Sequence, residues 1–163
     1  MKKSFSELKE RLDNDSLSSI PNKNGYYIIY SPEDFEIRFK CQTDAVERYV
    51  KEGEIIDLVY PLEILNSKLE AVQRIKDKEY RDVLYIGKAE GKNGLRQRIK
   101  QFVGYGYKTS NNHRGGRAIW QIENNKSLLL DYFVCENAEA RERDFLIEFK
   151  QKYDTYPLAN WQI

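Results

Sequence analysis

Two short runs of apolar and aromatic residues constrain the fold of this chain more than any other feature. The run at 25–31 is rich in tyrosine and isoleucine, begins with glycine and is followed by Pro32, and the run at 82–87 ends in glycine. Runs of this length and composition, bounded by glycine or proline, are typical of buried β-strands. Segments with apolar residues at helical spacing surround both runs, so the sequence predicts a sheet covered by helices.

The remaining pattern predicts the other elements. Strands are predicted at 35–39, where Phe35, Ile37 and Phe39 alternate with charged residues, and also at 55–60 and 128–134. A capping box at Ser4–Glu7 begins a first helix that ends near residue 13. Further helices are predicted over 43–53, 66–77, 95–103 and 138–153, with a glycine- and asparagine-rich loop over 104–116.

These elements fit one domain spanning residues 1–163. We predict an α/β (α+β) fold with a small, mostly antiparallel three-stranded central sheet flanked by helices, and with residues 31–83 as an inserted strand-and-helix subelement. The 27 basic residues nearly balance the 26 acidic ones, which excludes disorder driven by net charge. The longest apolar runs are too short to span a bilayer, and the N-terminus lacks a signal-peptide pattern. With only Cys41 and Cys135 available for disulfides, we expect a soluble cytoplasmic protein with no membrane partner.

Positive charge gathers in one part of the chain. Between Tyr85 and Lys126 there are nine basic residues and two acidic ones, with aromatic residues between them. Such a pattern suits a polyanion with stackable bases, because the charges contact phosphates and the rings stack on bases. A solvated basic face without a partner is the alternative interpretation. The candidate nucleic-acid contacts are Arg96, Lys100, Arg114 and Arg117.

Two tripeptides carry the most specific signal in the chain. Gly25-Tyr26-Tyr27 and Tyr85-Ile86-Gly87 each place a tyrosine on a predicted strand. Farther along come Arg98 on a predicted helix, Glu142 on the last helix and the closing segment Pro157-Leu158-Ala159-Asn160. In this order, the chain resembles the GIY-YIG nuclease superfamily, the catalytic module of certain homing, restriction and repair endonucleases. Tyrosine replaces the usual isoleucine in the first tripeptide, and the second matches literally.

The resemblance implies a divalent-metal-dependent endonuclease that hydrolyses DNA by a one-metal mechanism. By this resemblance Tyr27 is the base, Tyr85 orients water or phosphate, and Glu142 holds Mg²⁺ or Mn²⁺. Arg98 matches the catalytic arginine, whose planar fork suits phosphate oxygens. Because a free phenol has a pKa of ~10, Tyr27 needs nearby positive charge, which Lys88, Arg98 and the metal could supply. Gly87, His113 and Asn160 are expected to support the site.

The chain departs from the family pattern in one place. The two half-motifs of the family usually lie close together on paired strands, whereas residues 31–83 separate them here. This insertion is similar to that of a bacterial subgroup of the superfamily. Two alternatives stay open: a catalytically inactive nucleic-acid-binding module of the same fold, and an RNA nuclease. Glu139 and Glu148 are substitutes for Glu142 if the helix register differs, and a homodimer or an unknown protein partner is possible.

Overall fold

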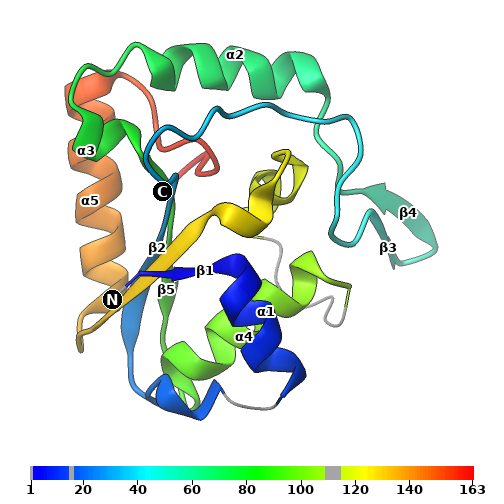
Figure 1. Cartoon of the computed structure of the whole chain (residues 1–163), viewed down its shortest axis with the longest axis vertical. Coiled ribbons are helices and arrows are strands. Elements are labelled where there is room, and N and C mark those ends of the chain that lie inside the picture. Colours follow the sequence, from blue (N-terminus) through cyan, green and yellow to red (C-terminus); the bar gives the residue numbers. More distant parts are fainter. Residues whose placement is uncertain (1, 15–16, 109–114) are drawn as a thin grey trace.

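An antiparallel sheet forms the centre of the molecule. The computed structural model describes residues 2–14, 17–108 and 115–163. Within these, the central sheet has the strand order β1 (Lys3–Ser4), β6 (Leu129–Val134), β2 (Gly25–Tyr30) and β5 (Val83–Ala89), and each neighbouring pair is antiparallel (Figure 1). The predicted α+β class is confirmed, and the sheet has a fourth strand, the two-residue β1, beyond the three expected from the sequence.

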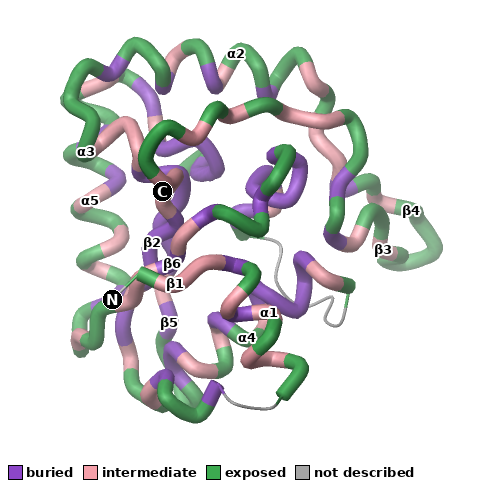
Figure 2. Tube along the Cα trace, in the orientation of Figure 1, coloured by how far each residue is buried: buried purple, intermediate pink, exposed green. Residues whose placement is uncertain are grey.

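Helices cover both faces of this sheet. On one side lie α1 (Phe5–Asp13) and α4 (Gly94–Gly106), and on the other lies α5 (Ala138–Tyr153) (Figure 1). Because side chains alternate along a strand, β2 contributes to two cores. Its Tyr27 and Ile29 belong to the larger cluster with Phe102 of α4, whereas Ile28 packs in a smaller cluster with Leu146 of α5. The buried residues accordingly concentrate along the strands and the inner helix faces (Figure 2).

Short elements complete the fold. The 3₁₀ turns are η1 (Leu17–Ser19), η2 (Arg117–Gln121) and η3 (Asn125–Ser127). The insertion contains the hairpin β3 (Arg48–Lys51) and β4 (Glu54–Asp57), followed by α2 (Leu62–Gln73) and the short α3 (Lys78–Arg81). Within the described part of the chain, no helix has both the length and the apolar character needed to cross a membrane.

Two predictions inside the insertion are wrong. The predicted helix over 43–53 is replaced by the β3–β4 hairpin, whose turn lies at Glu52 and Gly53. Both turn residues have positive φ, 52° and 80°, as the tightly twisted turns of two-residue hairpins require. Gly53 is therefore a turn glycine and not the end of a helix, and the neighbouring apolar residues Tyr49 and Val50 lie on opposite faces of the hairpin, the first packed on the core and the second exposed.

The predicted strand over 35–39 is also absent. Phe39 makes an isolated bridge with Ile122, and the Glu123 N–H donates to the Arg38 carbonyl at 2.8 Å. The backbone therefore pairs with the irregular segment after η2 and not with β2. Phe35, Ile37 and Phe39 alternate because one side of this extended loop packs on the core.

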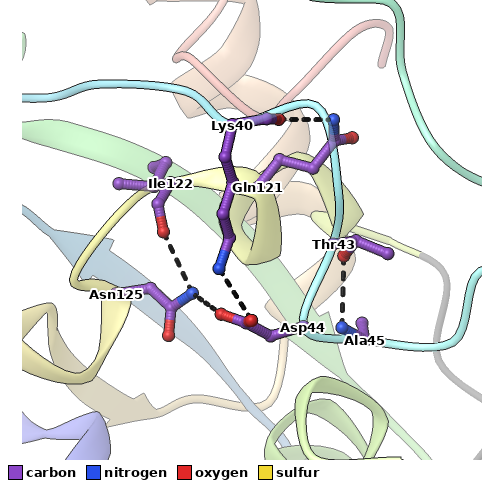
Figure 3. A network of polar contacts seen from close by, with 7 residues as sticks. All are labelled: Lys40, Thr43, Asp44, Ala45, Gln121, Ile122 and Asn125. Carbon is purple, nitrogen blue, oxygen red and sulfur yellow. Dashed lines mark hydrogen bonds and ion pairs between the residues drawn. The ribbon is translucent and has the colours of Figure 1, made fainter.

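A polar network fastens the loop at 40–45 to η2 and η3 (Figure 3). The Gln121 amide donates to the carbonyls of Lys40 and Tyr60 at 3.2 and 3.0 Å, and its oxygen accepts the Tyr60 N–H at 2.8 Å. The Asn125 amide donates to the Asp44 carboxylate and to the Ile122 carbonyl at 2.7 and 3.1 Å. Because both amides are buried, these bonds replace the water that the loop backbone would otherwise need.

Candidate functional site

The two tyrosines of the half-motifs lie side by side on neighbouring strands. Tyr27 of β2 is fully buried and Tyr85 of β5 is 7% exposed, with their ring centroids 6.0 Å apart and their side chains hydrogen-bonded to each other. Phe102 of α4 stacks on Tyr85 at 6.1 Å with nearly parallel rings. The tyrosine pair therefore packs between the sheet and α4, and this packing restricts the positions of both hydroxyl groups.

Gly87 provides the space that the Tyr27 ring occupies. The two residues are directly opposite each other in the β2–β5 register. A Cβ at position 87 would lie 2.6 Å from both the Cζ atom and the hydroxyl oxygen of Tyr27, which is closer than any side chain tolerates. The missing side chain of Gly87 therefore lets the Tyr27 phenol cross the neighbouring strand.

Arg98 and Glu142 come from helices on opposite sides of the sheet. Arg98 comes from α4 and Glu142 from α5, and both side chains are half-buried. The charges of both residues act on the pKa of each tyrosine, so all four groups lie within electrostatic range of one another. Glu142 therefore faces the tyrosine-bearing strands and not the far side of its helix.

Burial controls the protonation of these groups. It is the main cause that raises the pKa of Tyr27 well above its ordinary value, and Arg98 opposes it only in part. Burial, followed by the charge of Glu142, raises the pKa of Tyr85 to about 12. The pKa of Glu142 is also raised, first by burial and further by the negative charges of Glu139 and Glu90. Both phenols are therefore neutral at pH 7 unless further positive charge enters the site.

Lys88 lies next to this cluster within a set of acidic groups. Its Nζ atom forms an ion pair with Glu139 at 2.7 Å, which raises the pKa of Lys88. The Glu90 carboxylate accepts the backbone N–H of Glu139 at 3.0 Å, at the start of α5. The substitute carboxylate Glu139 is thus part of the same site, whereas Glu148 pairs with Lys152 at 2.7 Å elsewhere on the helix.

A small cavity opens at the edge of the site. It measures about 250 Å³ and is lined by Lys88, Glu90, Gly94, Gln97, Arg98 and Gln101. A neighbouring hollow of about 540 Å³ shares Gln97 and Gln101 with it and continues past Lys100. Solvent, or a polar ligand, can therefore reach Arg98 and Lys88 along α4.

Asn160 is bonded to the outer edge of β5, the strand that carries Tyr85. Its side-chain amide accepts the Ile86 N–H and donates to the Ile86 carbonyl, each at 3.0 Å, in the manner of a neighbouring strand. Lys68 of α2 donates to the Asn160 carbonyl and lies over the ring of Trp161, 4.4 Å from its centroid. Trp161 stacks in turn on Tyr60 at 5.0 Å. The insertion therefore clasps the C-terminal segment that holds the strand of Tyr85.

The predicted nucleic-acid contacts do not share one environment. Arg96 donates to the carbonyls of Ile20 and Ser18 at 2.7 and 2.9 Å, and Arg117 donates to the Leu58 carbonyl at 3.1 Å. Both guanidinium groups therefore hold loops of the fold. Lys100 is exposed beside the larger hollow. His113 and Arg114 lie outside the described residues.

Sequence reasoning missed several groups of the site. Gln101 accepts a long hydrogen bond of 3.5 Å from Arg98, and it lines both hollows together with Gln97. Phe102 contacts both tyrosines. Positions 97, 98, 101 and 102 follow the helical period, so their neighbourhood on the surface of α4 could have been predicted from spacing, although not the strand that it contacts.

None of the family models, curated proteins or solved structures compared with this chain matches it.

Proposed function

We propose that this chain is a metal-dependent endonuclease that hydrolyses DNA phosphodiester bonds, with a site built from Tyr27, Tyr85, Arg98 and Glu142. The observation that carries the proposal is the mutual electrostatic range of these four groups, which come from two strands and two helices. Such convergence of titratable groups with strongly shifted pKa values beside a cavity is typical of catalytic sites.

Glu142 is the group that would hold the cation. Its raised pKa reflects a buried carboxylate with like charges nearby, a state that a bound cation relieves. No cluster of three or more His, Cys, Asp or Glu side chains suited to a metal occurs among residues 2–14, 17–108 and 115–163. Mg²⁺ or Mn²⁺ suits a site with a single carboxylate, because Glu142 would hold it with waters and substrate phosphate completing the shell. Once bound, the metal would supply positive charge that polarises the phosphate and stabilises the leaving oxygen.

The chain's own residues would do the rest of the work. Arg98, beside the cavity, offers a planar fork to phosphate oxygens. Tyr27 is the candidate base. Because its pKa is raised, the phenol would first have to lose its own proton to solvent, which requires positive charge in the site, before it could accept a proton from the attacking water. Tyr85 shares a hydrogen bond with Tyr27 and would hold the attacking water or the phosphate in line. Lys88, paired with Glu139, adds charge at the mouth of the site.

Nicking of supercoiled plasmid in Mg²⁺ or Mn²⁺, with EDTA as a blank, tests this proposal. Tyr27→Phe and Glu142→Gln should each lower the rate at least about 100-fold, the usual loss for a missing general base or metal carboxylate. The matched controls are Tyr30→Phe, on the same strand, and Glu148→Gln, on the same helix but paired with Lys152. An inactive wild-type chain would refute the hydrolase, and an active Glu142→Gln variant would refute the metal assignment.

A non-catalytic nucleic-acid-binding module is the second candidate. The raised pKa of Tyr27 favours it, because a neutral buried phenol is a weak base. Retention of DNA without cleavage, equal for wild type and Tyr27→Phe, would identify this function. Cleavage of RNA in place of DNA would identify the RNA nuclease.

We place the activity in the cytoplasm, in keeping with the unpaired Cys41 and Cys135.

A further inference from the structure

The β3–β4 hairpin carries an exposed apolar pair that nothing in the chain covers within the described residues. Val50 and Ile55 are directly opposite each other across the two strands and are 70% and 71% exposed. They are the most exposed of the large hydrophobic residues among those described. The hairpin extends from the body of the molecule, on the side away from α5 (Figures 1 and 2). Its other face packs against the core through Tyr49 and Ile56.

A charged pair completes the outer face. Arg48 and Asp57 are opposite each other one step closer to the base of the hairpin, on the same face as Val50 and Ile55 because side chains alternate along a strand. Both are exposed, and neither has an ion-pair partner in the described part of the chain. One Asp57 oxygen accepts the Val59 N–H at 2.9 Å. The outer face therefore consists of one apolar cross-strand pair, Val50 and Ile55, next to one cross-strand pair of opposite charges, Arg48 and Asp57.

This arrangement is complementary to itself. When two such hairpins are placed face to face about a two-fold axis parallel to their strands, β3 of one lies over β4 of the other. Val50 then meets Ile55 of the partner subunit, and Arg48 meets Asp57 of the partner subunit, each contact occurring twice. Isologous interfaces of homodimers have this property, and sheets that pack face to face bury such rows between them.

We propose that the outer face of the β3–β4 hairpin is a docking surface for a second copy of this chain. The charge pattern favours this occupant: a second copy places an opposite charge across the interface from both Arg48 and Asp57, which a purely apolar partner cannot do. The proposal does not depend on the nuclease function. Only four side chains from each subunit form the centre of this interface, so its buried area is at the lower limit for specific protein–protein interfaces. The dimer is therefore weak and reversible.

Sedimentation velocity over about 10 to 500 µM protein, the range in which a small interface becomes half-formed, is the first measurement. Wild type should shift from monomer to dimer across this range, and Val50→Glu should stay monomeric throughout. The matched control is Val134→Glu, at an exposed valine on β6, which should associate like wild type. A wild type that stays monomeric, or a Val50→Glu variant that still dimerises, overturns the proposal.

Charge reversal then tests the pairing itself. Arg48→Asp places two acidic residues on the outer face, and Asp57→Arg places two basic ones. Each variant alone should therefore stay monomeric up to about 500 µM, the highest concentration of the first measurement. An equimolar mixture of the two should restore dimers at the wild-type concentration, because each face then meets its opposite. A role of these residues within one chain cannot produce rescue by mixing. Failure of the mixture to associate refutes this geometry, and circular dichroism on each exposed-site variant verifies its folding.

Discussion

Replacing Asn160 by alanine would remove the side chain that makes both hydrogen bonds to the Ile86 backbone at the outer edge of β5. Both hydrogen bonds to the Ile86 backbone measure 3.0 Å, and Ile86 is 1% exposed. An unsatisfied buried backbone group costs about 1 to 3 kcal/mol, so the two together cost about 2 to 6 kcal/mol. This is a large part of a typical total stability of about 5 to 15 kcal/mol.

Urea denaturation measures this loss as a lower midpoint with an unchanged slope. Asn125→Ala is the matched control, because Asn125 is also buried and also makes two hydrogen bonds (Figure 3), but to Asp44 and Ile122 and not to β5. Both variants should lose stability to a similar extent. Only Asn160→Ala should make the Ile86 N–H exchange with solvent faster than the global loss of stability explains, because that N–H then has no partner.

The reasoning about Asn160 makes two commitments that the same data can contradict. A stability loss below about 1 kcal/mol would mean that water or a shifted chain replaces the amide at no cost. Unchanged relative protection of the Ile86 N–H would mean that Asn160 does not hold the edge of β5. In the second case its predicted role in positioning the Tyr85 strand would also be lost.

Further predictions concern packing, protonation and the loop network. Gly87→Ala should lower the unfolding free energy by about 1 to 3 kcal/mol, because the new methyl group overlaps the Tyr27 ring. The same substitution in a Tyr27→Leu background should cost less, and equal losses in the two backgrounds would refute the overlap. The raised pKa of Glu142 means that the folded state binds its proton more tightly than the unfolded state. The unfolding free energy should therefore fall as the pH rises from the ordinary glutamate pKa through the raised pKa of the folded state. Glu142→Gln should therefore stabilise the protein at pH 7 and not at acid pH, and urea denaturation at both values will show whether the sign is right. Gln121→Ala should lose about 2 to 5 kcal/mol by the same assay, since three hydrogen bonds to the loop disappear, and a loss no larger than that of an exposed substitution would contradict this.

Local signals predicted the elements whose shape depends on their own residues. The Ser4 hydroxyl accepts the Glu7 N–H at 3.1 Å, as the capping box requires. The bounds of α5 coincide with the predicted 138–153, because a long helical stripe leaves few alternatives. The segment around Gly53 was mispredicted because a glycine can end a helix or turn a hairpin with equal local ease. Only the burial of Tyr49 and Ile56 against the core decides between them.

The site shows the same division. Motif order alone named Tyr27, Tyr85, Arg98 and Glu142, and it also named Asn160, although not its bonds to Ile86. Sequence reasoning expected positive charge to lower the pKa of Tyr27, whereas burial raises it. The desolvation of a phenol depends on what covers it, and here Tyr27 is covered in part by Phe102 of α4, a residue far away in the sequence.

By itself, then, the sequence determined the central strands β2, β5 and β6, the principal helices and the identity of the candidate site residues, because periodicity, caps and glycine positions act over a few neighbouring residues. Tertiary structure alone decided which charges meet, which groups lose water, and that the insertion clasps the C-terminal segment through Lys68 and Trp161. Those outcomes depend on contacts between segments far apart along the chain, whose free energies no local pattern encodes.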